Sequence, residues 1–194
     1  MNKIWHCVSL TALYIIFFSG CATTLDEVRL NYHTPAEIAS SFQSPPNSPI
    51  RMGTVSDKRG YENPRLLVYK QNLHGDTTKG GYLAEKPVSS VLEDALKEAL
   101  TKAKFNMDSE APDFELSGEL LAFNLDSAYG LKSRITMTLS LTSAASQKIV
   151  WSETFVGRAV VTKPPRLENC FTFALDDLIK KVVTSKSLAA KLKD

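Results

Sequence analysis

Hydrophobic residues recur with a helical period in two separate segments of the chain. In the first segment they are three and four residues apart, with charged residues between them: Val88, Val91, Leu92, Ala95, Leu96, Ala99, Leu100 and Ala103. In the second segment the same spacing links Leu167, Cys170, Phe171, Ala174, Leu175, Leu178, Ile179 and Val182. The spacing predicts two amphipathic helices, each with one face on a core. Ser90 and Glu93 are spaced as a capping box, which predicts where the first helix begins.

Between these segments the hydrophobic period changes to two, over residues 114–125, 135–141 and 149–161. Alternation of apolar and polar residues predicts strands that have one face on the core. The alternation changes phase near Leu120, which predicts a bulge or a bend there. Because only short polar turns separate the three strands, we expect them to form an antiparallel meander.

A further strand is predicted before the first helix, at Ile50, Met52 and Val55. A long connection follows it, with several glycines and a strand-like run at residues 66–69. The order is therefore strand, helix, three-stranded antiparallel meander, helix. We predict an α+β fold in which both helices pack on one face of the sheet.

The first 20 residues have the pattern of a secretory signal, with Lys3 in a short polar start and an apolar run at 4–18. Ser19, Gly20 and Cys21 follow, and this ending resembles the lipobox of bacterial lipoproteins. The resemblance implies cleavage before Cys21, which would then carry a diacylglycerol on its thiol and an acyl chain on its amine. Two alternatives are a secretory signal without lipidation and a transmembrane anchor, for which the apolar run is short.

The residue after the lipidated cysteine carries sorting information in lipoproteins of bacteria with two membranes. An Asp there favours retention in the inner membrane, whereas this chain has Ala22. The resemblance therefore implies a lipid anchor in the outer membrane, on its periplasmic face.

Residues 21–49 are polar and contain Pro35, Pro45, Pro46 and Pro49, which predicts a flexible tether. A coil of this length spans about 30 Å on average. Within it Val28, Leu30 and Tyr32 alternate with polar residues, which predicts an edge strand. We therefore divide the chain into a signal peptide (1–20), a lipidated tether with an edge strand (21–49) and a single α+β domain (50–194).

Charge and cysteine content narrow the class of function. The chain has 23 basic and 21 acidic residues, and loss of Lys3 with the signal leaves 22 and 21. A nearly neutral chain is not expected to bind nucleic acid, which requires clustered positive charge. Cys7 leaves with the signal and Cys21 is lipidated, so Cys170 cannot form an intramolecular disulfide. Its place on the helical stripe predicts a buried apolar role.

The order of elements and several local patterns look like the YajG-type family of bacterial lipoproteins. The matching residues are the lipobox, the strand ending in Asp57 and Arg59, the connection with glycines, and the helix with Pro87, Val88, Leu92, Ala95, Leu96, Ala99 and Leu100. The likeness covers about Cys21 to Val183. The chain departs from it at Lys104, where relatives tend to have Gly. The resemblance implies an envelope lipoprotein like those that accompany transport machinery, and it supplies no catalytic residues.

The sequence has no pattern of residues typical of catalysis or of a metal site. His33 and His74 have no metal-ligand spacing, and the Gly75–Gly81 run lacks the order of a phosphate-binding loop. We therefore predict no enzymatic activity, no metal and no cofactor beyond the acyl chains on Cys21.

A partner surface is predicted on the long connection. Asp57 and Arg59 lie at the end of a strand, and Tyr61, Tyr69 and Tyr82 follow in or near loops. Loops often carry binding groups, and tyrosine is enriched at interfaces. The alternatives are a local salt bridge at the root of the loop and ordinary packing of the tyrosines.

Two functions remain open at this point. The first is a membrane-anchored accessory lipoprotein that presents its domain to an envelope protein or to lipid. The second is a carrier that holds an acyl chain or a cell-wall fragment in an apolar site between sheet and helices.

Overall fold

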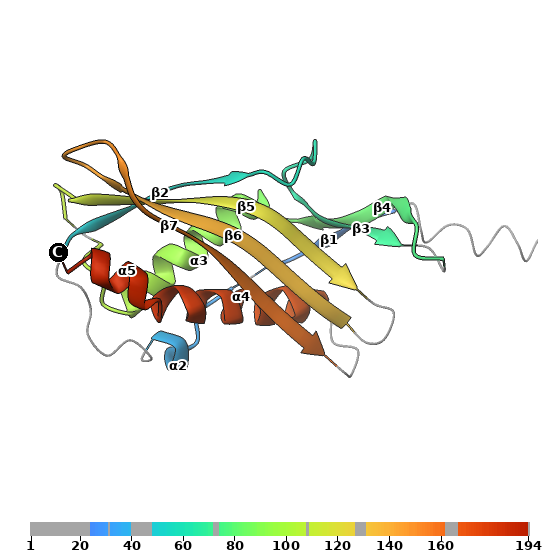
Figure 1. Ribbon diagram of the computed structural model, residues 1–194. Helices are drawn as coiled ribbons and strands as arrows, with labels where there is room; N and C mark the ends of the chain where they lie inside the picture. Colours follow the sequence, from blue (N-terminus) through green and yellow to red (C-terminus); the bar gives the residue numbers. More distant parts are fainter. Residues whose placement is uncertain are drawn as a thin grey trace, which may run out of the picture.

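The computed structural model describes residues 24–30, 32–39, 48–71, 74–107, 109–126, 131–161 and 167–193. The signal segment and Cys21 lie outside the described residues. The fold combines helices with two β-sheets, which confirms the α+β class (Figure 1).

The larger sheet has four strands in the order β2-β5-β6-β7. These are β2 (Ile50–Asp57), β5 (Phe114–Asp126), β6 (Leu131–Ser143) and β7 (Ile149–Val161). β2 runs parallel to β5, whereas β5, β6 and β7 are antiparallel neighbours. The pairing of β5 with β6 shifts register between Leu120 and Ala122, where the sequence predicts a bulge. The shift leaves Leu121 40% exposed.

One face of this sheet is apolar and is covered by helices. On β6 every second residue is fully buried, at Ile135, Met137, Leu139 and Leu141. Helix α3 (Val88–Lys102) contacts β2, and helix α4 (Leu167–Val183) contacts both β6 and β7. The two helices also contact each other (Figure 1). The core therefore lies between the helices and the inner face of the sheet.

Helix α3 does not begin at the predicted capping box. Its N-cap is Pro87, and no side chain caps its first turn. The Glu93 side chain instead accepts a hydrogen bond from the backbone N–H of Val55 at 3.2 Å. Val55 follows the register shift in β2, so Glu93 provides a partner for a strand N–H. The capping-box prediction is wrong because Glu93 bonds to the sheet.

The long connection after β2 pairs with a segment before β2 in a second, smaller sheet, and within that connection the sequence analysis predicts only the strand at residues 66–69. The sheet contains β1 (Leu25–Val28), β3 (Leu66–Gln71) and β4 (Thr77–Ala84) in the order β1-β4-β3. β3 and β4 are antiparallel, and β1 pairs with β4 in parallel, with Leu25 opposite Gly81.

The segment expected to act as a tether is part of the fold over residues 24–30 and 32–39. β1 is an edge strand, and the Val28, Leu30, Tyr32 and Ile38 side chains are at most 9% exposed in the core. The Tyr32 hydroxyl donates to Asp176 Oδ1 on α4 at 2.9 Å, and the short helix α2 (Ala36–Ala39) also contacts α4. The packed structure therefore begins well before residue 50.

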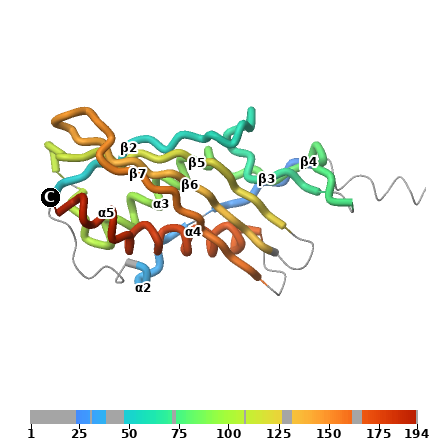
Figure 2. Tube along the Cα trace, viewed as in Figure 1, coloured from blue at the N-terminus to red at the C-terminus, as the bar shows by residue number. Residues whose placement is uncertain are grey.

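The C-terminal region continues the helical layer. Ser185 caps the short helix α5 (Lys186–Lys191) by accepting a hydrogen bond from the Leu188 N–H at 3.2 Å. The Trp151 indole N–H on β7 donates to Ser187 Oγ at 3.0 Å. The C-terminus and the N-terminal strand β1 lie at opposite ends of the elongated molecule (Figure 2).

Candidate functional site

Asp57 and Arg59, two predicted site residues, form a buried clamp between the two sheets. Arg59 Nη2 lies 2.6 Å from Asp57 Oδ2, and Arg59 Nε lies 2.9 Å from Asp57 Oδ1. Arg59 Nη1 also donates to the Leu67 carbonyl oxygen on β3 at 3.0 Å. The Arg59 side chain is 3% exposed and that of Asp57 is 16% exposed. The pair thus joins the end of β2 to β3, and its guanidinium is not accessible to a partner.

The positive charge of Arg59 determines the protonation state of the Asp57 carboxyl group. Burial alone would raise the pKa of Asp57, but the hydrogen bonds and positive charge of Arg59 outweigh it and hold the pKa below its ordinary value. The carboxylate is therefore ionised and paired at neutral pH. This arrangement matches the structural alternative for these two residues, a salt bridge at the root of the loop.

Tyr61 and Tyr69 are brought together beside this clamp. Their rings meet edge to face with centroids 5.4 Å apart, and the Arg59 guanidinium lies 4.9 Å from the Tyr61 ring centroid. Tyr69 is 37% exposed, and Leu25 on the edge strand is 50% exposed. We name Leu25, Tyr61 and Tyr69 the apolar shoulder of the small sheet.

Tyr82 does not belong to this group. It lies directly opposite Val68, whereas Tyr69 lies opposite Gly81, so the two tyrosines point to opposite faces of the small sheet. Lys70 Nζ lies 5.3 Å from the Tyr82 ring centroid and 2.7 Å from Asp26 Oδ2. The structure therefore separates the five predicted residues into a buried clamp, an exposed tyrosine pair and a tyrosine covered by Lys70.

The edge of β7 is occupied by side chains of α4. Lys181 Nζ donates to the Val156 carbonyl oxygen and to Asp177 Oδ2, both at 2.7 Å. Asp177 Oδ2 accepts from the Arg158 backbone N–H at 2.8 Å. A surface pocket of about 630 Å³ lies beside this edge and extends to Glu153 and to Ser187 on α5. These contacts occupy backbone groups that an edge strand otherwise offers to another chain.

Two arginines that the sequence analysis does not single out lie opposite each other on the outer face of the larger sheet. Arg134 on β6 pairs directly with Arg158 on β7. They line a pocket of about 250 Å³ together with Asn124, Asp126 and Lys132. The signal that could identify them is the register of the strands, because they are far apart in the sequence.

Cys170 is fully buried, and burial raises the pKa of its thiol. The buried Ser133 hydroxyl on β6 donates to the Cys170 carbonyl oxygen at 2.6 Å. This bond fixes the first turns of α4 against the sheet, and Cys170 is part of that packing.

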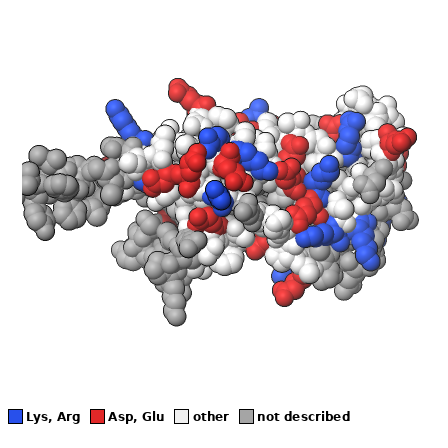
Figure 3. All heavy atoms as spheres, turned by 180° about the vertical axis from the view of Figure 1, so that it is seen from behind, with Lys and Arg blue, Asp and Glu red and all other residues white. Residues whose placement is uncertain are grey.

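The described part of the chain has neither a membrane-spanning helix nor a cluster of metal-ligating side chains. Within the described ranges, no helix is both long enough and apolar enough to cross a membrane. In the same part of the chain, no three His, Cys, Asp or Glu side chains are placed to hold a metal ion together. Charged side chains of both signs are interspersed on the face seen in Figure 3.

No protein-family model and no curated protein matches the sequence. Among solved structures, protein XCC0632 from Xanthomonas campestris, of the family DUF330, aligns with a TM-score of 0.62 and 17% identity over 85% of this chain and 96% of that chain. An uncharacterized protein aligns with a TM-score of 0.51 and 12% identity over 88% of this chain and 97% of that chain. At these identities the likeness shows a shared fold and does not extend to function.

A known lipoprotein is also among the structural matches. Lipoprotein GNA1162 from Neisseria meningitidis aligns with a TM-score of 0.33 and 13% identity over 71% of this chain and 99% of that chain. That TM-score is too low to carry an argument about this chain. The YajG-type assignment therefore stays a prediction from the sequence.

Proposed function

We propose that the protein is a membrane-anchored accessory lipoprotein that presents its α+β domain to an envelope protein or to lipid. The observation that carries the proposal is the run Ser19, Gly20, Cys21 directly after an apolar segment of signal length. Two or three acyl chains on one residue give an effectively permanent anchor, whereas one chain gives a transient one. Because Ala22 follows, the proposed address is the outer membrane, on its periplasmic face.

The position of β1 supports a short distance between the anchor and the fold. Leu25 is the first residue of β1 and is four residues after Cys21. A fully extended chain of four residues spans at most about 14 Å. An acylated Cys21 would therefore hold the small sheet beside the lipid headgroups, instead of letting the domain move on a tether of about 30 Å.

The proposed contact with a partner is the apolar shoulder, Leu25, Tyr61 and Tyr69. Its tyrosines are rigid and amphipathic, and such side chains are enriched where proteins meet. The buried pair of Asp57 and Arg59 fixes the backbone beneath Tyr61 and so contributes indirectly.

The carrier function is not favoured by the packing between sheet and helices. The side chains that face each other there are fully buried and belong to one continuous core that includes Leu96, Leu139 and Leu178. An acyl chain could enter this described region only if the core opened. We therefore do not propose a carrier.

Metabolic labelling with palmitate tests the anchor. The wild-type protein is expected to take up label, and Cys21→Ser is expected to lose it. Cys7→Ser is the matched control and should keep the label, because Cys7 lies within the proposed signal. An unlabelled wild type, or a labelled Cys21→Ser variant, would contradict the proposal.

Photo-cross-linking in intact cell envelopes tests whether the apolar shoulder contacts a partner. A photoreactive residue at position 69 is expected to give a defined cross-linked band. The control position is Ile149, which is 65% exposed and lies on β7, in the other sheet. Equal products from both positions would show that the apolar shoulder is not selective.

A further inference from the structure

The pairing of β6 with β7 places two positive charges directly opposite each other. Arg134 and Arg158 are register partners, so their Cβ atoms are about 5 Å apart on one face of the sheet. Like charges in this position destabilise a sheet. An anion bound between the two groups would relieve this repulsion.

The two guanidinium groups take part in no ion pair among the described residues, and the carboxylate of Asp126 lines the same pocket. Their neighbour on β5 is the neutral Asn124, which lies opposite Arg134. Asp126 lies opposite Lys132 at the end of the strands, so it stands beside a third cation. Both arginine side chains and that of Lys132 are exposed.

The pocket beside these residues is smaller than a drug-sized ligand site. Its volume of about 250 Å³ is below the range of about 300–1,000 Å³ that drug-sized ligands occupy. Guanidinium groups bind phosphate with two parallel hydrogen bonds. Two adjacent arginines therefore match a phosphate group better than they match one carboxylate group.

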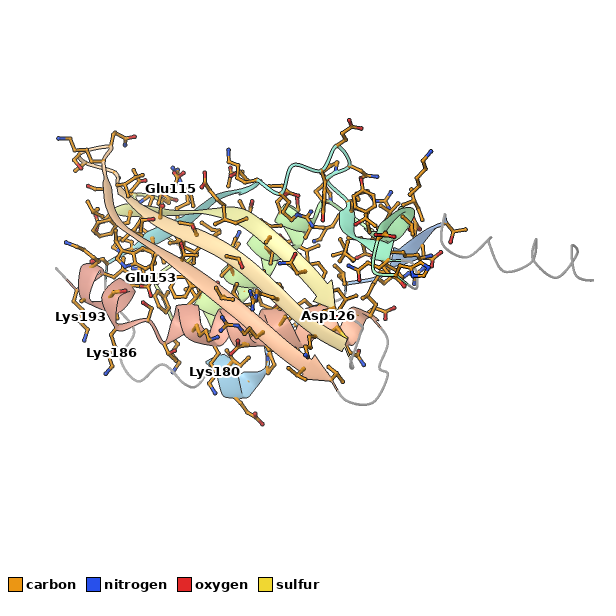
Figure 4. All side chains as sticks on the ribbon, turned by 45° about the vertical axis from the view of Figure 1, so that its right-hand side comes forward. Glu115, Asp126, Glu153, Lys180, Lys186 and Lys193 are labelled. Atoms are coloured by element: carbon orange, nitrogen blue, oxygen red, sulfur yellow. The ribbon has the colours of Figure 1, made fainter. Side chains whose placement is uncertain are left out.

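The site lies at the end of the molecule from which the chain continues toward Cys21. Asp126, at the end of β5, is at the opposite end from Lys186 and Lys193 (Figure 4). In Figure 1 the ends of β5 and β7 and the start of β1 lie on the same side of the molecule. Because at most about 14 Å of chain joins Leu25 to Cys21, this end is the one that an acylated Cys21 would hold at the membrane.

We propose that Arg134 and Arg158, with Lys132 beside them, form a binding site for the phosphate of an anionic lipid headgroup. The site deepens the proposed function and rests on it, since acylation of Cys21 brings the site to the bilayer. It would fix the orientation of the domain on the membrane, which acyl chains alone leave free.

Vesicle binding by the processed chain with Cys21→Ser, residues 21–194, tests the site without the acyl chains and without the apolar run at 4–18. This variant is expected to bind vesicles of phosphatidylglycerol and phosphatidylcholine, and not vesicles of phosphatidylcholine alone. Adding Arg134→Gln and Arg158→Gln should lower the affinity about 30-fold, because each basic residue near an anionic surface contributes about a factor of five. Adding Lys186→Gln and Lys193→Gln removes the same charge at the opposite end and should change the affinity less than about twofold.

A thermal melting series separates a binding role from a structural one. Arg158→Gln removes a like-charge contact, so its melting temperature without ligand should equal or exceed that of the parent. A marked decrease would show that the arginines serve the fold, and it would overturn the site. Glycerol phosphate is the soluble probe. If it raises the melting temperature only when the arginines are present, and the protein does not bind anionic vesicles, the ligand is a soluble phosphate and not a lipid headgroup.

The outcomes also separate this site from the proposed anchor. Unlabelled wild type in the palmitate experiment would overturn the anchor, whatever the vesicles show. A labelled wild type, together with vesicle binding that both double variants reduce equally, would overturn the arginine site alone.

Discussion

Asp57 and Arg59 show how a short polar run determines local structure. Two residues apart in sequence, they form a bidentate ion pair that also holds the Leu67 carbonyl of a neighbouring strand. Because the Arg59 side chain is 3% exposed, its charge depends on this one carboxylate. A buried charge that loses its partner carries a large desolvation penalty.

Removing the carboxylate should therefore be costly. We expect Asp57→Ala to lower the free energy of unfolding by about 3–5 kcal/mol, measured by urea denaturation at neutral pH. Adding Arg59→Met should restore most of the loss, because no unpaired charge remains. Asp94→Ala is the control: it breaks the exposed pair with Lys86, whose side chains are 42% and 66% exposed, and should cost less than about 1 kcal/mol.

The same pair predicts a dependence on pH. The pKa of Asp57 is lower in the folded state than its ordinary value of 3.8. Its stabilisation is therefore complete above that value and is lost as the pH falls through the lower folded-state pKa. The difference in stability between wild type and Asp57→Ala should shrink in this acidic range. A difference that stays constant there would contradict the assigned ion pair.

Gly157 shows how closely two elements approach. A Cβ atom at this position would lie 2.1 Å from the Ala174 carbonyl oxygen and 2.6 Å from Leu178 Cβ, both on α4. The helix therefore packs on the backbone of β7, where only glycine fits. Gly118 faces side-chain atoms instead, and a Cβ there would lie 2.8 Å from the Met137 terminal methyl.

We expect Gly157→Ala to destabilise the fold strongly because α4 must move away from β7. The cost should exceed the 1–3 kcal/mol typical of overpacking, and thermal unfolding measures it. Gly118→Ala is the matched control, since the flexible Met137 side chain can move, and its cost should be smaller. Equal effects of the two substitutions would show that the contact between helix and strand is not the limiting one.

The elements differ in how well the sequence predicts them. The helices α3 and α4 and the long strands have an apolar period that a single core imposes, so their positions follow from the sequence. The sequence predicts the strand-like run at 66–69 but not the small sheet, because β4 contains Gly80 and Gly81 and pairs with β1 from a distant segment. Partners at such a distance leave no local period.

The residues of the candidate sites follow the same rule. Asp57 and Arg59 were identified because they are only two positions apart, although they form a clamp and not an exposed contact. Arg134 and Arg158 were missed because only the register of β6 with β7 places them together. Lys104 adopts a φ of 63° just after α3, a conformation in which glycine is favoured.

At the scale of the whole molecule, the two ends have different surroundings in the proposed function. The small sheet lies at the end where β1 begins, and α5 and the C-terminus lie at the other end (Figure 2). Asp126, which lines the arginine pocket, also lies at the opposite end from Lys193 (Figure 4). Since β1 runs parallel to β4, the start of β4 lies at the end of the small sheet from which residue 24 leaves. This orientation places Lys79 near the headgroups and Lys193 away from them.

A spin label at each end tests this orientation in the acylated protein. Lys79→Cys and Lys193→Cys each add one accessible thiol, because Cys21 carries lipid in the proposed function and Cys170 is fully buried. In vesicles, a relaxing agent bound to headgroups should broaden the signal of a label at position 79 and leave a label at position 193 unaffected.

The segment between Cys21 and Leu25 is the linker in this experiment. Inserting about ten Gly and Ser residues between Ala22 and Thr23 tests whether its short length holds position 79 near the headgroups. The longer linker should keep palmitate uptake and weaken the broadening at position 79, because the covalent limit of about 14 Å is removed. If Arg134→Gln and Arg158→Gln are then added, the remaining broadening should disappear. Equal broadening at positions 79 and 193 in the unmodified linker would contradict the orientation while leaving the anchor intact.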